Sequence, residues 1–286
     1  MTKSRRFSKN LARFALFNLL SVTLLFGCQA NIEPTYKEKN IPSLVKKICK
    51  EEYNLDVTTF RTDTTLWIYA PTEKILHKDY GVIKDKIFDE EMWDKLRNIL
   101  TTIGRVLISS DNTPEFYALT ISDIKQGVDF AMIGNVLDIK KSYAGFIPPT
   151  ESNRRYVHLF KLVPEAVGDT KGGHIEPYNI TLPDFLAEQI AQRIGAIFQE
   201  EGMKNYFKVE KSVGGFSKNV FFFAYSMQKT SPPPKPVDIK EMMLDTIAYC
   251  LQTYEFKDFD GVVITDLTTR DRTDVSRGLI LSRKIL

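Results

Sequence analysis

The feature that most restricts how this chain can fold is a recurring order of one amphipathic helix followed by two short strands. After residue 40, apolar residues return first at helical spacing and then in two short runs bounded by turn residues, and this order occurs four times. A hairpin alone is only marginally stable, so each pair of strands needs a neighbouring pair or a helix to cover it. The sequence therefore predicts an α+β fold, with antiparallel sheet and helices packed on one face.

The first two repeats form residues 41–134. Ser43 is expected to cap the first helix and Asp89 to begin the second, whose apolar residues continue to Leu107. Gly127 lies in a loop of the length that joins the two strands of a hairpin. We expect the strands of these repeats at 55–60, 65–69, 116–122 and 128–133.

The last two repeats form residues 181–286. Thr181 begins a helix with capping-box spacing, Asp238 does the same for the next helix, and Gly202 is expected to end the earlier one. We expect the strands at 206–213 and 220–227, on either side of Gly214-Gly215, and at 260–268 and 277–282.

One of these strands contains Phe221-Phe222-Phe223. Because side chains alternate between the two faces of a sheet, this strand is apolar on both faces. We interpret it as a central strand that is covered twice; a partner against one face is the alternative.

Between the two pairs of repeats, residues 135–180 are the least regular part of the chain. Short helices are expected at 136–141 and 150–156, and a loop at 168–173. Connections this long are uncommon inside a compact domain and are usually functional or linkers. We therefore expect two αββαββ domains, 41–134 and 181–286, joined by an irregular or helical connector. A single longer sheet is the alternative.

The N-terminus carries a second pattern, in which basic residues precede the apolar run 14–26 and Gly27-Cys28 follows it. This order is typical of a secretory signal rather than of a folded element. It resembles the lipoprotein signal read by signal peptidase II, with Leu25 at minus three, Gly27 at minus one and Cys28 as the lipidated residue. An ordinary cleaved signal and an uncleaved membrane helix are the alternatives, but the run is shorter than the ~20 residues that span a bilayer.

The resemblance implies a protein of the bacterial cell envelope, held to a membrane by acyl chains such as palmitate on Cys28. Residues 1–28 are then the signal, and residues 29–40, which are polar and contain Pro34, form a flexible tether. Gln29 stands where an aspartate would retain such a protein in the inner membrane, so we expect the outer membrane. The periplasmic and the outer face both remain open.

The charge of the chain changes once this signal is set aside. The signal holds five of the 39 basic residues and none of the 36 acidic ones, so the remainder has a formal net charge of −2 rather than +3. A nearly neutral protein gives no electrostatic case for nucleic acid as a partner.

Only Cys49 and Cys250 remain after Cys28, and both lie in helical apolar patterns. An oxidising compartment permits a bridge between them if their Cα atoms lie within about 7 Å. We expect two separate buried thiols instead, because a free cysteine usually behaves as a small apolar residue.

The chain lacks the short motifs of common catalytic and metal sites, such as G-x-S-x-G, H-E-x-x-H, a P-loop or paired C-x-x-C. Its three histidines are scattered, and the aspartates between 258 and 274 do not have EF-hand spacing. We predict no catalytic residue, no metal and no cofactor. As candidates for a pocket in the connector we single out His158, His174, Arg154 and Arg155.

Three functions fit these observations. The repeated order of elements is similar to that of BON domains, small periplasmic modules, and this likeness implies binding or scaffolding at an envelope membrane. We therefore expect a non-catalytic, lipid-anchored binding or assembly protein with a protein partner in the envelope. The alternatives are an envelope hydrolase in which His158 or His174 contacts a carboxylate, and a carrier of an apolar ligand between sheet and helices.

Overall fold

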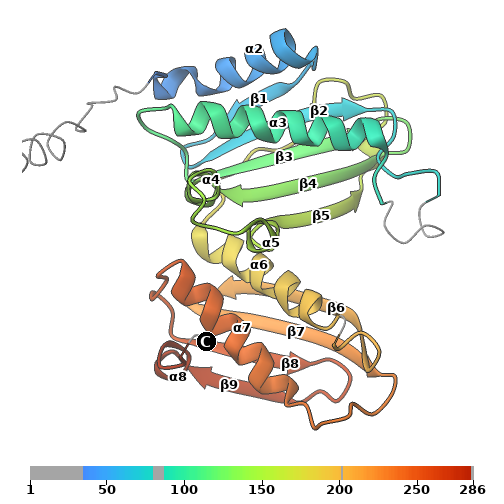
Figure 1. Cartoon of the computed structure of the whole chain (residues 1–286), viewed down its shortest axis with the longest axis vertical. Helices are drawn as coiled ribbons and strands as arrows, with labels where there is room; N and C mark the ends of the chain where they lie inside the picture. Colours follow the sequence, from blue (N-terminus) through green and yellow to red (C-terminus); the bar gives the residue numbers. More distant parts are fainter. Residues whose placement is uncertain (1–34, 80–86, 201, 285–286) are drawn as a thin grey trace, which may run out of the picture. The chain divides into compact units, whose positions relative to one another are not determined.

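A computed structural model describes residues 35–79, 87–200 and 202–284. Residues from Tyr36 onward form one compact unit, which contains a sheet of five strands and a sheet of four, with helices packed against both (Figure 1). The α+β fold that the sequence predicts is confirmed.

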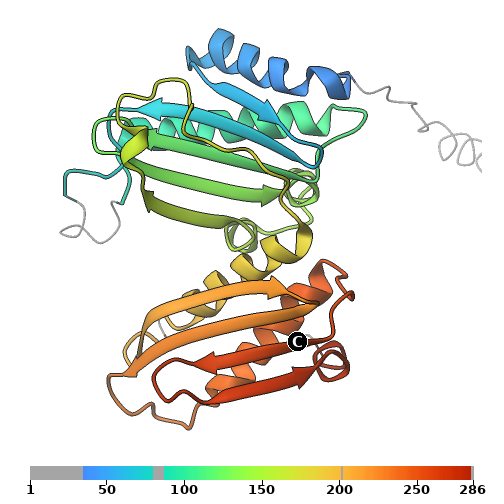
Figure 2. The ribbon, with the colours of Figure 1, turned by 180° about the vertical axis from the view of Figure 1, so that it is seen from behind.

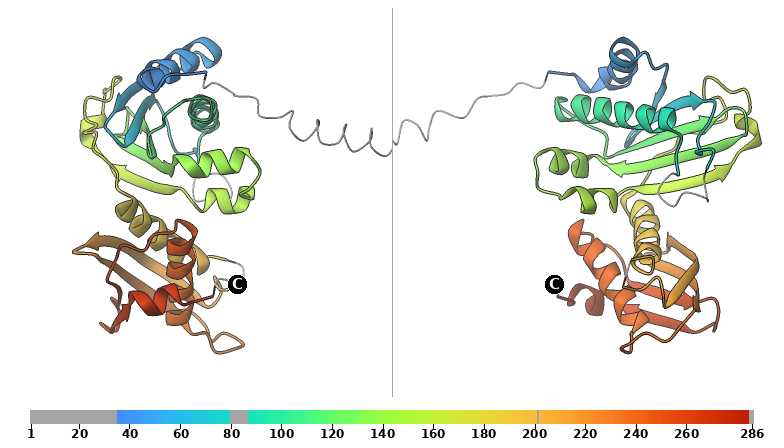
Figure 3. Two further views of the ribbon diagram at one scale, coloured as in Figure 1. Left: turned by 90° about the vertical axis from the view of Figure 1, so that its left-hand side faces the viewer. Right: turned by 45° about the vertical axis from the view of Figure 1, so that its right-hand side comes forward.

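The first sheet has the strand order β1-β2-β3-β4-β5, and two long helices cover one of its faces (Figures 1 and 3). Two short helices follow β4, and a 3-10 turn lies at either end of this half. Their bounds are η1 Glu38–Asn40, α2 Ile41–Tyr53, β1 Thr58–Arg61, β2 Thr65–Thr72, α3 Glu90–Ile108, β3 Phe116–Asp123, β4 Val128–Asn135, α4 Val136–Tyr143, α5 Pro149–Asn153, β5 Val157–Leu162 and η2 Pro164–Ala166.

The second sheet has the order β6-β7-β8-β9, and its two long helices also lie on one face. The elements are α6 Leu182–Ile197, β6 Phe207–Ser217, β7 Val220–Lys229, α7 Ile239–Thr253, β8 Gly261–Asp266, β9 Arg272–Ser276 and α8 Arg277–Leu281. The run from α6 to β9 repeats the topology of the run from α2 to β4.

Each sheet is mixed rather than wholly antiparallel. Two antiparallel hairpins lie side by side, and the inner strands of the two hairpins run parallel, β2 beside β3 and β7 beside β8. The long helix between the hairpins is the reason, because it returns the chain along the face of the sheet to the end at which the previous strand began. The sequence shows each hairpin but not the direction in which two hairpins meet.

The helix starts agree with the predicted caps at three of four positions. Asp89, Thr181 and Asp238 each accept a hydrogen bond from a backbone N–H of the first turn. The prediction that Ser43 caps the first helix is wrong. The cap position is Asn40, and the Ser43 hydroxyl donates to the Asn40 carbonyl at 2.9 Å. Proline at position 42 suits the first turn of a helix, so the helix begins earlier.

The folded part begins before residue 40, which the sequence predicts as the end of a flexible tether. The backbone N–H of Tyr36 donates to the Ser109 carbonyl at 3.0 Å, and the Glu38 N–H donates to the Asp111 carboxylate at 2.8 Å. These contacts with the end of α3 fix residues 36–40, which therefore belong to the folded part.

Two predicted boundaries in the second half are wrong. Gly214-Gly215 lies inside β6, and the turn is made by Lys218 and Asn219, both with positive φ (50° and 59°). The helix α6 ends at Ile197 rather than near Gly202, because Phe198 packs against Phe207 at the start of β6, with 5.9 Å between ring centroids.

The last predicted strand, 277–282, is also wrong. The turn after β8 is tight, since the Asp266 carboxylate accepts hydrogen bonds from the N–H groups of Thr268 and Thr269. The final strand therefore comes earlier, at Arg272–Ser276, and the segment after it forms the short helix α8, whose Ile280 is buried.

Cys49 and Cys250 are both buried and free, which confirms the prediction of two separate thiols. Burial raises the pKa of Cys49 and of Cys250, so neither is a reactive thiolate. The strand with three phenylalanines is central, as expected, but it is covered only once: Phe221 and Phe223 are buried, whereas Phe222 is 42% exposed on the face without helices.

The other face of the first sheet is covered by the chain itself. Residues 163–181 cross this face on the way to α6 (Figure 2). The Trp67 indole N–H donates to the Tyr178 carbonyl at 3.0 Å, and the Tyr69 hydroxyl donates to the Asp169 carbonyl. In the described ranges, no helix is long and apolar enough to cross a membrane.

Candidate functional site

A pocket of 660 Å³ lies between α3 and the two outer strands β4 and β5. Alternation along β4 turns Phe130 and Met132 toward α3, and antiparallel pairing sets Phe160 and His158 of β5 beside them. The helices α3 and α4 form the opposite wall, through residues that include Leu100 and Tyr143. The pocket thus follows from a sheet that is wider than the helix pair that covers it.

The floor of this pocket is a cluster of aromatic rings centred on Phe130, which is buried. Its ring centroid lies 5.0 Å from those of Phe88 and Phe160 and 5.9 Å from that of His158. Trp93 stacks on Phe88 at 5.9 Å and is half-exposed at the rim. These are ordinary distances for packed rings, so the floor is a pre-formed apolar surface.

Two polar side chains that line the pocket, Thr101 and Arg97, have partners on their own helix. The hydroxyl of Thr101 donates to the Arg97 carbonyl at 2.9 Å, and the Arg97 guanidinium pairs with Asp94 at 2.7 Å. Burial lowers the pKa of His158, so its imidazole is neutral at pH 7. The pocket therefore offers uncharged, largely apolar surface and suits an apolar group.

A second cluster surrounds His174 on the opposite face of the same sheet. Its Nδ1 lies 2.6 Å from the Asp169 carboxylate and its Nε2 lies 3.1 Å from the Asp129 carboxylate. The imidazole is 6% exposed, and Tyr69 packs edge-on at 5.6 Å. This histidine fastens the crossing segment 163–181 to β4.

The His174 cluster does not have the geometry of a catalytic triad. The nearby hydroxyl of Ser122 donates to the Asp129 carboxylate at 2.5 Å instead of to the imidazole, so His174 does not stand in the position of a triad's general base. The hydrogen bonds of His174 and of backbone N–H groups outweigh the effect of burial and lower the pKa of Asp169 to about 2. A fully bonded, enclosed cluster of this kind stabilises the fold rather than binding a substrate.

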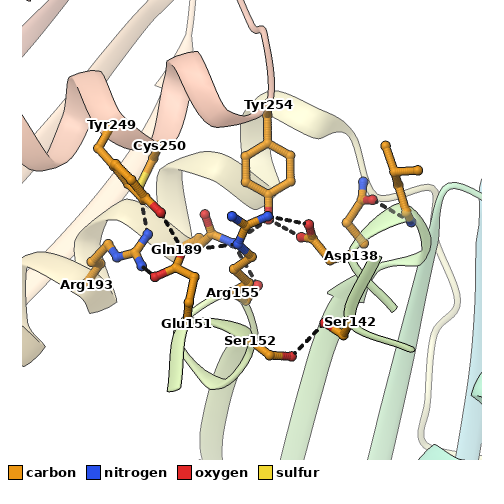
Figure 4. A network of polar contacts seen from close by, with 12 residues as sticks. Asp138, Ser142, Glu151, Ser152, Arg155, Gln189, Arg193, Tyr249, Cys250 and Tyr254 are labelled. Atoms are coloured by element: carbon orange, nitrogen blue, oxygen red, sulfur yellow. Dashed lines mark hydrogen bonds and ion pairs between the residues drawn. The ribbon is translucent and has the colours of Figure 1, made fainter. Parts of the chain in front are cut away.

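A network of buried charges connects α4 and α5 with α6 and α7 (Figure 4). The Arg155 guanidinium bonds Asp138 at 2.8 Å and Glu151 at 3.1 Å, and the Tyr254 hydroxyl donates to Asp138. Burial would raise the pKa of Glu151, but the charge of Arg193 and the hydrogen bonds that Glu151 accepts keep it below its usual value.

The charged groups of the network are paired with one another, although the side-chain oxygen of Gln189 is buried without a partner. Arg193 pairs with Glu151, and the Gln189 amide donates to the Arg155 carbonyl at 2.7 Å. Beside it lies a pocket of 400 Å³ lined by several charged residues, of which Arg283 pairs with Asp245 at 2.5 Å. Because these charges neutralise one another, we interpret the network as structural.

The four connector residues singled out from the sequence do not form one site. His158 lies on the α3 face of the first sheet and His174 on the opposite face. Arg155 belongs to the buried network, and Arg154 pairs with Glu200 at the surface, at 2.6 Å. Cys28, Leu25 and Gly27 lie outside the described residues.

The pocket aromatics Phe88, Phe130 and Phe160 are absent from that selection. Residues 157–162 become more exposed along the strand, from the buried Val157 to the exposed Leu162, and they lie in the segment that the sequence predicts as an irregular connector, so their pairing with β4 is not predicted. The signal that could have revealed it is the short run 157–162, in which four of six residues are apolar: Val157, Leu159, Phe160 and Leu162.

No group of three or more histidine, cysteine, aspartate or glutamate side chains that could hold a metal occurs within residues 35–79, 87–200 and 202–284. Comparison of the chain with protein-family models, curated proteins and solved structures gives no match.

Proposed function

We propose that this chain is a lipid-anchored, non-catalytic binding protein of the bacterial cell envelope, and that the pocket between α3 and β4–β5 is its binding site. The observation that supports the proposal is the pre-formed aromatic floor around Phe130, open at a half-exposed rim. Its volume of 660 Å³ lies in the range of ligand sites, about 300–1,000 Å³.

The pocket can supply binding energy without charge. Each methylene group that leaves water for such a surface contributes about 0.8 kcal/mol, so a side chain or acyl segment of a few carbons gives measurable affinity. The hydrolase alternative has less support, since the histidine that contacts carboxylates, His174, is enclosed and has no aligned nucleophile.

The anchor is supported by the sequence around Leu25 and Cys28. A binding site on such a protein acts at the membrane surface, where partners of the envelope meet it at high local concentration. We propose the outer membrane because Gln29, rather than an aspartate, follows Cys28.

The pocket is tested with 1-anilinonaphthalene-8-sulfonate, a fluorescent probe whose aromatic rings bind apolar surfaces while its sulfonate stays in water, added to the purified protein. Leu100→Trp fills the pocket from the α3 wall and should weaken probe binding at least about tenfold. Ile108→Trp, at the end of the same helix and outside the pocket, should leave it unchanged. Equal binding by both variants contradicts the proposed site.

A further inference from the structure

The strand that borders the pocket, β5, is an edge of its sheet, and its outward-facing backbone is only partly used. The His158 N–H donates to the Gln192 side-chain carbonyl at 3.0 Å, and the Gln192 amide donates to the His158 carbonyl at 2.7 Å. Gln192 thus makes at His158 the pair of hydrogen bonds that a neighbouring strand would make.

The hydrogen bonds of His158 also show which backbone groups of β5 point away from β4. In an antiparallel pair, alternate residues turn both backbone groups toward the partner strand or away from it. Since His158 faces away from β4, Phe160 and Leu162 also face away. The Val163 N–H, which donates to the Gly127 carbonyl at 2.7 Å on the β4 side, agrees with this alternation.

Beyond Gln192 the edge is open. Among the residues that the structure describes, none makes a hydrogen bond to the outward N–H or C=O of Phe160 or Leu162. Their side chains are 50% and 83% exposed and lie on the pocket side of the sheet, where Phe160 forms part of the pocket wall. Free backbone groups and free apolar side chains therefore occur on the same two residues.

We propose that the open edge of β5 and the pocket together bind an extended segment of a partner protein, which adds to the sheet as a strand. This inference rests on the proposed function and names the class of partner. The backbone of the segment pairs with Phe160 and Leu162, and an apolar side chain enters the pocket. A free acyl chain would fill the pocket but would leave the four backbone groups of the edge unpaired.

The geometry also sets the pattern of the segment. Alternate side chains of a strand lie on one face, about 7 Å apart, so every second residue reaches the pocket side. The pocket carries no free charge, which favours aromatic or aliphatic residues at those positions. Gln192 occupies the outward backbone groups of His158, so pairing is confined to Phe160 and Leu162, toward the end of β5. Such strand addition is a general mode of peptide recognition.

The test uses an array of synthetic heptapeptides with Phe, Leu, Ile, Val or Trp at alternate positions and Thr between them. Binding to the purified full-length protein is measured by fluorescence polarisation, against peptides of the same composition in non-alternating order. Alternating peptides should bind at least about tenfold more tightly. Peptides N-methylated at every second residue come in two registers. Methylation of the N–H groups that face β5 should abolish the tighter binding of alternating peptides, whereas methylation of the N–H groups that face away should not.

A proline variant separates the contribution of a backbone N–H to peptide binding from that of the side chain. Leu162→Pro removes an outward N–H without removing a hydrogen bond to β4, and proline is tolerated at such positions of edge strands. It should weaken peptide binding at least about fivefold relative to Leu162→Ala. As a second measurement, hydrogen exchange of the Phe160 and Leu162 amides in the unaltered protein should slow when an alternating peptide is added.

The outcomes separate this inference from the proposed function. Peptides that bind without preference for alternation, or amides that keep exchanging, overturn strand addition. If the fluorescent probe binds in the pocket and no peptide does, the binding site stands and the inference fails. If neither binds, both fail.

Discussion

His158 and His174 occupy opposite faces of one sheet and have opposite electrostatic surroundings. His174 lies between two carboxylates, whereas His158 stacks on Phe130 and has no charged partner. A partly buried imidazole that is withdrawn from water favours its neutral form, which is why the pKa of His158 is lowered. The same residue keeps the pocket uncharged at neutral pH.

The pH dependence of stability should report on His158. Its folded-state pKa lies below the unfolded value of about 6.5, so the stability contributed by the neutral form is complete above that pH and is lost as pH falls through it. Urea unfolding measures the free energy of unfolding of the unaltered protein and of His158→Phe. The value for the unaltered protein minus that for the variant should fall between pH 7.5 and 5, by at most about 1.4 kcal/mol per pH unit. A difference that is constant, or that grows on acidification, contradicts this assignment.

Residue-level features were predictable where the partners are close in sequence. The cap at Thr181 depends on Asp184, three positions later, and the sequence shows it. The partner of His174, Asp129, lies 45 positions away, and only the crossing segment brings them together. Likewise, nothing local in the sequence connects Phe88 with Phe160, so the pocket could not be predicted without the pairing of β4 and β5.

The contact between α6 and β6 depends on a single glycine. A Cβ atom added at Gly214 would lie 2.1 Å from the Ala187 carbonyl oxygen, so helix and strand approach more closely than any side chain permits. At the neighbouring Gly215 an added Cβ meets nothing within 4 Å. Both glycines, expected from the sequence between two strands, thus lie inside one strand, and only Gly214 is required there by packing.

These two glycines give a matched pair of variants. Gly214→Ala should lower the free energy of unfolding by about 2–3 kcal/mol, because backbone on either side must move. Gly215→Ala should change it by no more than about 0.5 kcal/mol. Chemical denaturation followed by circular dichroism measures both. Equal effects would mean that α6 does not lie so close to β6.

Elements were predicted better than their arrangement. Helices show a periodicity and a cap within about a dozen residues, and α3, α6 and α7 were placed from these signals alone. The parallel pairing of β2 with β3 depends on the path of a whole helix, and the strand β5 depends on β4 as a template. Such information is not contained in any short window of sequence.

The whole molecule repeats one αββαββ topology, and buried charges join the two copies. Asp138, in the helix that follows the first copy, accepts a hydrogen bond from Tyr254 of the second, and the carbonyl of Arg155 accepts one from Gln189. Removing one member of such a network leaves another charge buried and unpaired, which is strongly unfavourable. The topology was visible in the sequence as four repeats, but the network was not, because its members lie up to 116 positions apart.

The membrane anchor is tested on the whole protein in cells. Bacteria fed an alkyne-tagged palmitate analogue should label the unaltered protein, and Cys28→Ser should lose the label and leave the membrane fraction. Cys49→Ala, which changes a buried thiol, serves as the control and should remain labelled. Label that persists in Cys28→Ser contradicts lipid attachment at this residue.

The segment 163–181 has a consequence for the order in which the protein is made. Trp67 and Tyr69 receive their cover from residues 111 and 100 positions later in the chain. These covering residues follow all five strands of the sheet in the chain. Until they are in place, Trp67 and Tyr69 lack their hydrogen-bond partners, so this face of the first sheet is completed last, by chain that comes after every strand of that sheet.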